Sequence, residues 1–304
     1  MLFGEFELFS LSDGFFALDG GAMFGVVPRV FWQKSNPPDE RNRISLALRP
    51  LLVRTRQALV LMETGVGDKQ DAKFQEIYKV KHTSSLLESL ARAGFKPEDI
   101  THVVNSHLHF DHCGGNTRFE PQTSADSTQT GRQGSENQPP VTSHQSPVAV
   151  PTFPNAKYYV QAREWEMATH PDKRSKASYL PENFMPVFEA GQLVQVQGDT
   201  EIVPGVSVVY TGGHTGGHQS LTVRSQGKTA IYWGDLIPTV SHINVPYVMG
   251  YDTMPLQTMD QKEKLLKQAL AENWLMFFEH DPEVCCGYLS EENGRYSVRS
   301  QKSE

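Results

Sequence analysis

One short segment, from His107 to His112, carries three histidines and one aspartate in the order His-Leu-His-Phe-Asp-His. It follows the segment 99–106 (DITHVVNS), which is typical of an extended strand. In an extended backbone the side chains alternate in direction, so His107 and His109 point the same way and can bind one metal ion. Asp111 and His112 come where the strand ends and face another direction, so they suit a second ion beside the first.

Three further candidate ligands each follow an apolar run later in the chain. His214 stands in YTGGHTGGHQS, Asp235 in AIYWGDLIP and His280 in MFFEHDP. A lone aspartate at a strand end usually serves the turn, but three ligand types in equivalent positions favour a convergent site. One histidine-rich turn cannot complete the coordination of two ions, so these residues are the candidates for the remaining ligands.

Short strands and helices must position these residues. Asp13-Gly14 between two apolar runs predicts a hairpin over 6–21. A second strand pair is expected over 45–55 and 58–65, and single strands over 157–161, 193–197, 206–212, 221–225, 229–235 and 275–281. Helical spacing predicts a helix within 84–95, with a serine at its start and Gly94 at its end, and a longer helix over about 256–274.

One stretch interrupts this alternation. Between residues 120 and 147 the only aliphatic side chains are Ala125 and Val141, among many Ser, Thr, Gln and Pro residues. Such a composition buries too little apolar surface to offset the entropy cost of ordering, so we expect a flexible surface insertion at about 120–150. Its position shortly after the histidine cluster leaves a lid over the site as the alternative, which deletion of residues 122–148 would test by turnover.

Composition restricts the classes of partner. The net charge of −7 and the absence of a basic run argue against a nucleic-acid partner. The first residues carry Glu5 and Glu7 where a secretory leader needs a basic start, and no window approaches about 18 apolar residues. We therefore expect a cytoplasmic protein with no membrane partner and a small-molecule substrate.

The candidate ligands resemble those of the metallo-β-lactamase-fold hydrolases in their binuclear form. In chain order the matching residues are His107, His109, Asp111, His112, His214, Asp235 and His280. The stretches LDGGAMFGVVPRVFW, SHLHFDHCGGNT, TGGHTGGH and EHD are most similar to the YtnP-type quorum-quenching lactonases, which are related to the N-acyl-homoserine lactonases.

This resemblance implies a fold and a division of the ligands. The fold is an α/β (α+β) protein built as a four-layer αββα sandwich, with one domain over residues 1–304 and both metals at one edge. The implied ligands of one ion are His107, His109 and His214. The implied ligands of the other ion are Asp111, His112 and His280, and Asp235 bridges the two. A homodimer is also implied by the resemblance alone.

Two divalent ions in such a site would support hydrolysis at neutral pH. Paired ions lower the pKa of bound water from about 15.7 to about 7, so a hydroxide bridging them can attack a lactone carbonyl. Asp111 and Asp235 are the expected catalytic carboxylates, and Asp111 can pass the proton across. Zinc is the expected metal because imidazole and carboxylate suit it, although these ligand types also permit iron, manganese or cobalt.

Substrate contacts are less directly marked by the sequence. Met23, Phe24 and Val27 lie in an apolar stretch that either lines an acyl-chain pocket or packs into the core. His242 follows the expected bridging aspartate and is a further candidate for a substrate contact. The N-acyl-homoserine lactonases carry a tyrosine three residues after that aspartate, where this chain has Pro238, so Tyr247 or Tyr251 would have to replace it or the substrate differs.

Other functions use related ligands. A phosphotriesterase-like hydrolase would use the same types of metal ligand. A glutathione thioesterase would need a helical C-terminal domain, for which the chain after His280 is too short. β-Lactamases generally lack the bridging aspartate, and nucleases of this fold carry a large inserted domain and basic surfaces. A non-catalytic metal sensor is the alternative from another class, and turnover assays separate it from an enzyme.

Overall fold

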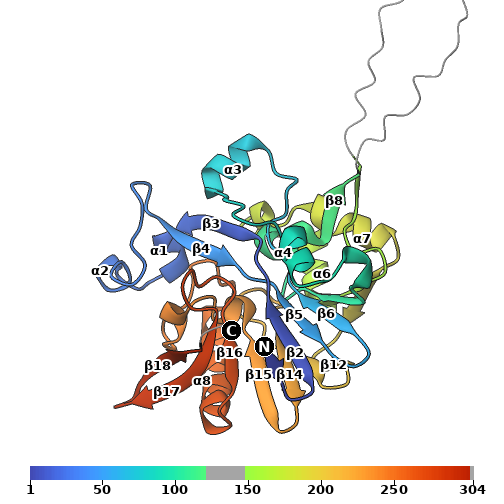
Figure 1. Ribbon diagram of the computed structural model, residues 1–304. Helices are drawn as coiled ribbons and strands as arrows, with labels where there is room; N and C mark the ends of the chain where they lie inside the picture. Colours follow the sequence, from blue (N-terminus) through green and yellow to red (C-terminus); the bar gives the residue numbers. More distant parts are fainter. Residues whose placement is uncertain (121–147, 302–304) are drawn as a thin grey trace, which may run out of the picture.

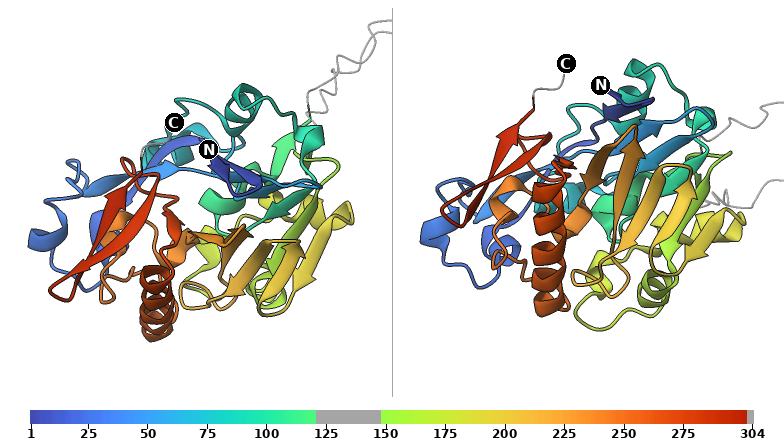
Figure 2. Two further views of the ribbon diagram at one scale, coloured as in Figure 1. Left: turned by 60° about the horizontal axis from the view of Figure 1, so that its bottom comes forward. Right: turned by 90° about the horizontal axis from the view of Figure 1, so that it is seen from below.

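Two large β-sheets packed face to face form the centre of the molecule, with helices on their outer faces (Figures 1 and 2). The computed structural model describes residues 1–120 and 148–301. Most of the predicted insertion at about 120–150 therefore lies outside the described residues, and its flexibility and its role as a lid stay predictions.

The first sheet has seven strands. In spatial order these are β1 (Leu2–Phe3), β2 (Phe6–Ser10), β5 (Leu51–Arg54), β6 (Leu59–Met62), β7 (His102–Val104), β10 (Lys157–Gln161) and β11 (Leu193–Val196). Pairing is antiparallel from β1 to β6 and parallel from β6 to β11. Parallel neighbours require a crossover connection, and helices provide it here.

The second sheet also has seven strands. Its order is β12 (Thr200–Val203), β13 (Val206–Tyr210), β14 (Gln219–Ser225), β15 (Lys228–Tyr232), β16 (Leu275–Phe277), β17 (Cys286–Glu292) and β18 (Arg295–Ser300). Neighbouring strands are antiparallel except β15 and β16. The parallel pair is joined by a long segment that contains helix α8 (Pro255–Ala271).

Alternation along the strands builds three apolar layers. Leu51 and Val53 of β5 point into the layer between the two sheets, whereas Leu52 points to the outer face. In the second sheet Tyr232 faces the inner layer and Ile231 packs outward against α8. Period-two alternation with apolar residues on both faces is what a sheet covered on both sides requires. The layers therefore follow the order helix, sheet, sheet, helix, and the predicted αββα sandwich is confirmed.

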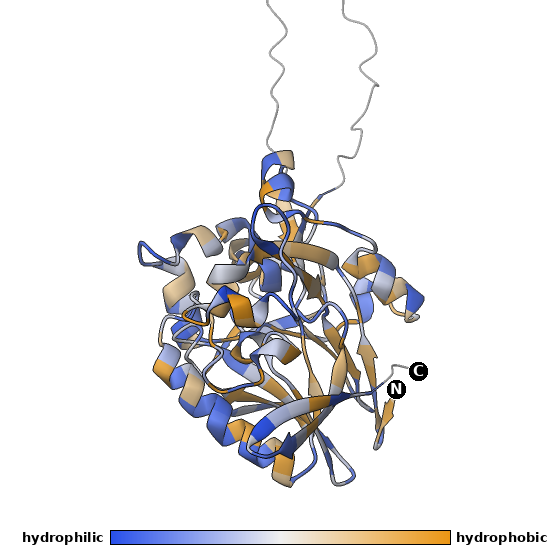
Figure 3. Ribbon diagram, turned by 90° about the vertical axis from the view of Figure 1, so that its left-hand side faces the viewer, coloured by the Kyte–Doolittle hydropathy of each residue, from blue (hydrophilic) through white to orange (hydrophobic). Residues whose placement is uncertain are grey.

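The helices pack on these outer faces through one apolar side each. Helix α4 (Leu86–Arg92) begins at Ser85, whose hydroxyl accepts a hydrogen bond from the Glu88 N–H, while the Glu88 carboxylate accepts one from the Ser85 N–H. This reciprocal cap satisfies two otherwise unpaired amides and fixes the start of the helix. Leu86 and Leu90 bury against the first sheet, and Leu265 and Leu266 of α8 bury against the second. Figure 3 shows hydrophobic residues concentrated on the interior strands, while the outer helices carry both kinds.

Smaller elements surround the edge of the sandwich. The strands β3 (Gly14–Asp19) and β4 (Arg43–Leu48) form one ribbon, and β8 (Thr117–Phe119) and β9 (Ala149–Pro151) form another. The remaining helices are α1 (Gly20–Phe24), α2 (Arg29–Trp32), α3 (Ala72–Tyr78), α5 (Phe110–Cys113), α6 (Ala162–Thr169) and α7 (Met185–Glu189). Helices α1 and α2 lie beside the β3–β4 ribbon, at the left of Figure 1. Among the described residues, no helix combines the length and the apolar character needed to cross a bilayer.

The predicted hairpin around Asp13-Gly14 is wrong. Strand β2 pairs with β1 and β5, and β3 pairs with β4, so the two runs flanking this dipeptide belong to different sheets. The Asp13 carboxylate is buried and accepts hydrogen bonds from the amides of Gly67 and Leu86. Gly14 has φ = 91°, and a Cβ there would lie 2.1 Å from the Lys81 carbonyl oxygen. This dipeptide allows two chain segments to cross closely. The same dipeptide is also typical of a tight turn, so the sequence does not distinguish the two.

Candidate metal centre

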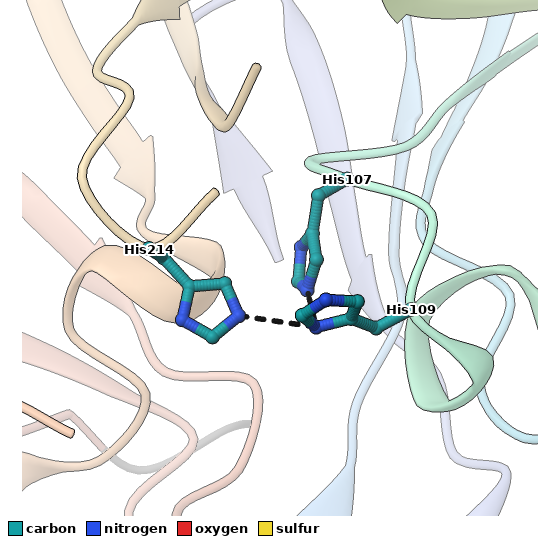
Figure 4. Close-up of side chains that lie close together, drawn as sticks. All are labelled: His107, His109 and His214. Atoms are coloured by element: carbon teal, nitrogen blue, oxygen red, sulfur yellow. Dashed lines mark hydrogen bonds between the residues drawn. The ribbon is translucent and has the colours of Figure 1, made fainter. Parts of the chain in front are cut away.

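The first group of histidines converges on a single point at one edge of the sandwich. His107 Nε2 lies 2.9 Å from His109 Nδ1, which in turn lies 3.2 Å from His214 Nε2 (Figure 4). The ring nitrogens of all three lie within 4.8 Å of one another, and all three residues are buried. Three imidazole nitrogens aimed at one another form a site in which one cation can accept all three lone pairs.

A second group lies beside the first. Asp111 Oδ2 is 3.6 Å from His112 Nε2 and 3.6 Å from His280 Nε2. The two histidine Nε2 atoms are 3.3 Å apart. These three side chains are also buried and form a second set of oxygen and nitrogen ligands suitable for a divalent cation.

Asp235 lies between the two groups. Its Oδ2 atom is 3.2 Å from His214 Nε2 in the first group and 3.5 Å from His112 Nε2 in the second. Its Oδ1 atom is 3.3 Å from His280 Nε2 and has no hydrogen-bond partner among the described residues. One buried carboxylate therefore faces both groups, which is the position of a bridging ligand.

The polypeptide brings these residues together from the ends of strands in both sheets. His107 and His109 lie in the loop after β7, and Asp111 and His112 lie in the short helix α5 that follows it. The other three follow β13, β15 and β16 of the second sheet. Before Asp235, Gly234 has φ = 56°, and a Cβ there would lie 2.8 Å from the Ser106 Cβ. The turn therefore requires glycine where it passes the segment after β7.

Neighbouring groups hold the imidazole rings in place. The Nδ1 atom of His214 lies 2.9 Å from Asp252 Oδ1, and His280 Nδ1–H donates to the Ala47 carbonyl at 2.8 Å. Partners on the outer nitrogen fix the tautomer and leave Nε2 free to face a metal. His218 accepts a hydrogen bond at Nε2 from the Asp235 amide, and its Nδ1 lies 2.6 Å from the Thr211 hydroxyl, so it supports the position of Asp235 and has no ring nitrogen left for a metal.

The charges of the site fit cations. Burial lowers the pKa of His107 and His109 well below the ordinary value, so both are neutral and able to act as ligands. Burial alone would raise the pKa of Asp235, yet His112 and His214 hold it well below its usual range. Around His112 burial opposes protonation, but Glu279, Asp111 and Asp235 raise its pKa well above the ordinary value. An environment that favours positive charge beside neutral imidazoles and an ionised carboxylate fits divalent ions, and this ligand set suits zinc.

A cavity opens beside the two groups. Its wall includes Leu18, Met23, Tyr78, Phe110, Met249 and Tyr251, and it reaches His109, Asp111, His214, Asp235 and His280. Apolar and aromatic side chains thus surround a polar floor, the usual composition of a small-molecule site.

The candidate substrate contacts occupy different places. Met23 lies in the cavity wall. Phe24 is fully buried and its ring stacks between Trp32, 5.3 Å away, and His242, 4.4 Å away. His242 donates from Nε2 to the Met23 carbonyl at 2.8 Å, and Val27 is partly buried in the same apolar cluster. Only Met23 of these four lines the cavity, so a direct substrate contact by the other three stays a prediction.

Of the two candidate tyrosines, Tyr251 lines the cavity beside the ligand groups, as Tyr78 also does, whereas the Tyr247 ring packs edge-on against Phe24 at 6.3 Å. Burial raises the pKa of Tyr251, so its hydroxyl stays protonated and can donate a hydrogen bond. Pro238 instead uses its carbonyl to accept a hydrogen bond from the His280 amide.

Two further residues of the site carried no recognisable sequence signal. Asp252 orients His214 from 38 residues away. Glu164 accepts hydrogen bonds from the Leu108 amide, the Tyr179 hydroxyl and the Thr215 hydroxyl, so it ties the two histidine-bearing loops together. An isolated acidic residue on a helix resembles any surface carboxylate in sequence, and only its burial reveals this role.

A sandwich of two mixed sheets with a histidine and aspartate centre at one edge defines a class of metal-dependent hydrolases. The chain belongs to the metallo-beta-lactamase superfamily, whose family model matches residues 51–127 and 149–280.

Individual relatives and solved structures include lactonases and metal-dependent hydrolases. An N-acyl homoserine lactonase of Bacillus cereus is 26% identical over 80% of this chain and 84% of its own length. A probable metal-dependent hydrolase from Staphylococcus aureus has a crystal structure that is 29% identical, with full coverage of both chains and a TM-score of 0.84. The dizinc quorum-quenching lactonase AidC, solved with an N-acyl-homoserine product, shares the fold at 23% identity, with a TM-score of 0.74 over 100% of this chain and 97% of its own.

Proposed function

We propose that this protein is a dizinc hydrolase that opens the lactone ring of N-acyl-homoserine lactones or closely related lactones. The observation that carries the proposal is the buried Asp235 carboxylate, whose two oxygens face two separate ligand groups. Curated relatives that cover four-fifths of the chain are N-acyl homoserine lactonases, which supports the substrate class.

Each group of ligands would hold one ion. His107, His109 and His214 would bind the first, while Asp111, His112 and His280 would bind the second. Asp235 would bind both. Two such ions supply a nucleophile from water at neutral pH and polarise the carbonyl under attack.

The chain's own residues would bind and orient the lactone. Met23, Met249 and Phe110 give the cavity an apolar wall suited to the acyl chain. The Tyr251 hydroxyl lies in the cavity wall and is protonated at neutral pH, so it would donate a hydrogen bond to the substrate carbonyl. The Asp111 carboxylate reaches the cavity, so it is placed to accept a proton and return it to the departing alkoxide oxygen.

The test combines metal analysis with turnover. Purified protein is screened in a pH-stat against lactones, thioesters and phosphotriesters, with metal content measured on the same sample. We expect two equivalents of zinc and turnover of acyl-homoserine lactones. Turnover restricted to thioesters or phosphotriesters would replace the proposed substrate class.

The matched variants are Asp235→Asn and Asp260→Asn. Asp260 is exposed on α8, so its change to asparagine should leave both metal content and turnover at wild-type values. Asp235→Asn should lower both, because it removes the charge shared by the two groups. Unchanged values in Asp235→Asn would remove this residue from the site.

A further inference from the structure

Lys262 is a fully buried lysine on α8 that takes no part in the metal centre. Its ammonium group donates hydrogen bonds to three backbone carbonyls, those of His242 at 2.6 Å, Asn244 at 2.8 Å and Tyr247 at 2.7 Å. All three acceptors belong to one segment that follows the bridging aspartate. A lysine is almost never fully buried unless its charge is compensated, so this arrangement needs an explanation.

Packing alone does not require an amine at this position. The other buried side chains of α8 are Thr258, Leu265, Leu266 and Ala269, and the last three form an apolar face against the second sheet. Burial is strong enough to lower the pKa of Lys262 to about 7, and the opposing charge that acts on it is Asp252. A leucine or methionine would fill such a space without this electrostatic cost. The three carbonyl bonds are therefore what the lysine provides.

The segment that Lys262 holds, residues 242–252, forms one side of the substrate cavity. At its start His242 donates to the Met23 carbonyl, and near its end the Gly250 amide donates to the Ala22 carbonyl at 2.7 Å. Both bonds fix helix α1, which contributes Met23 to the cavity wall. Met249 and Tyr251 of the segment line the cavity directly.

The same segment has little regular structure of its own. Apart from a single 3₁₀ turn at 240–242 it contains no helix or strand. It has a few turn hydrogen bonds of its own, such as that from the Tyr247 amide to the Asn244 carbonyl at 2.9 Å, and bonds from other elements hold it in place. Three of those bonds come from the Lys262 ammonium group. They satisfy backbone carbonyls that make no hydrogen bond within a helix or a sheet.

We propose that Lys262 is a positioning residue that fixes segment 242–252 as the substrate-binding wall of the cavity. Lys262 does not line that cavity, and it acts through the carbonyls of the segment. Substrate affinity and acyl-chain selectivity, more than metal binding, then depend on it. The part of this inference that concerns lactones rests on the proposed function.

The test compares Lys262→Met with Lys264→Met. Both changes replace a lysine of α8 by a side chain of similar length, but Lys264 is exposed. In Lys262→Met we expect about a 10-fold rise in KM for the lactone with kcat within about 3-fold of wild type, the pattern of losing binding that is equal in the ground state and the transition state. Amide hydrogen exchange should accelerate across 242–252 and not in the sheets. Turnover is measured at saturating zinc, because Asp252 at the end of the segment faces His214. A KM and exchange pattern equal to those of Lys264→Met would overturn the proposal.

A second variant serves if Lys262→Met does not fold. Lys262→Gln keeps two N–H donors, and its exchange rates across 242–252 should lie between wild type and a fully released segment. Wild-type protection of these amides in Lys262→Gln would contradict the proposal. Because hydrogen exchange needs no substrate, it tests the positioning role even if the protein hydrolyses no lactone, in which case the proposed function fails separately.

Discussion

At the scale of single residues, Asp235 lies between the two ligand groups, and His214 and His280 each have a hydrogen-bond partner behind the ring. Spacing in the sequence was sufficient to select all seven candidate ligands, because alternation and strand ends are local properties. The structure brings these seven side chains together, and their role as metal ligands is the proposal made above. Asp252 could not be selected in this way, because its contact with His214 exists only after folding.

Asp252→Asn tests the importance of such a partner. Asparagine keeps the size of the side chain but removes the charge that faces His214 Nδ1 at 2.9 Å. Changes of this kind weaken metal binding by about 10–100-fold, so we expect a zinc affinity reduced by about that factor. Competition with a chromophoric chelator measures the affinity, and Asp260→Asn is the control. Equal affinities in the two variants would show that Asp252 does not support the ligand.

Phe24→Ala separates a core role from a pocket role. Phe24 is fully buried between Trp32 and His242 and is absent from the cavity wall. We expect the free energy of unfolding to fall by about 3–5 kcal/mol, as for other buried phenylalanines, with normal metal content. Urea denaturation measures the first quantity. A changed acyl-chain preference with unchanged stability would instead assign Phe24 to the pocket.

At the scale of elements, strands and helices were more predictable than the connections between them. Helix α4 and α8 were expected within a few residues of their observed bounds, since caps and apolar periodicity are read locally. The predicted Asp13-Gly14 hairpin is wrong, because a tight turn and a close crossing between two sheets both require a glycine with positive φ. The dipeptide alone therefore cannot distinguish them. The pairing of strands that are distant in the chain also could not be predicted from the sequence, since it depends on how the whole chain folds.

Glu164→Gln tests how α6 ties the ligand loops. The carboxylate accepts three hydrogen bonds from Leu108, Tyr179 and Thr215 in a fully buried position. A glutamine loses one accepting oxygen, which leaves a buried donor unpaired and should lower the free energy of unfolding by about 1–3 kcal/mol. Denaturation of the zinc-free protein measures this, with the exposed Glu166→Gln on the same helix as control. No difference between the two variants would mean that the loops are held by other contacts.

His242→Gln tests the segment beside α1 through pH. Burial lowers the pKa of His242 to about 3, whereas an unfolded histidine titrates near 6.5. The unfolded chain therefore binds more protons between these values, and stability contributed by His242 is lost as pH falls below about 6.5. Wild type should lose about 2 kcal/mol more than His242→Gln between pH 7 and pH 5. Parallel denaturant curves at the two pH values measure the difference, and an equal loss in both proteins would contradict a neutral buried His242.

At the scale of the whole molecule, the metal centre joins the two halves of the sandwich. The first sheet contributes the histidine-rich turn and the second contributes His214, Asp235 and His280. The centre therefore forms only when both sheets pack, and zinc should raise the unfolding temperature of the whole structure by binding the folded state alone. Removal of the metal with a chelator should reverse that rise.

The homodimer implied by the resemblance stays a prediction. Sedimentation equilibrium of the purified protein should give twice the 34.1 kDa of one chain. A mass of one chain at micromolar concentration would reject it without affecting the metal centre.

The most direct test of the central claim is an anomalous difference map at the zinc edge from crystals of the zinc-loaded protein. We predict two peaks about 3.5–4 Å apart, with Asp235 between them and the two ligand groups on either side. A single peak, or His214 and His280 turned away from the histidine-rich turn, would contradict the dinuclear hydrolase.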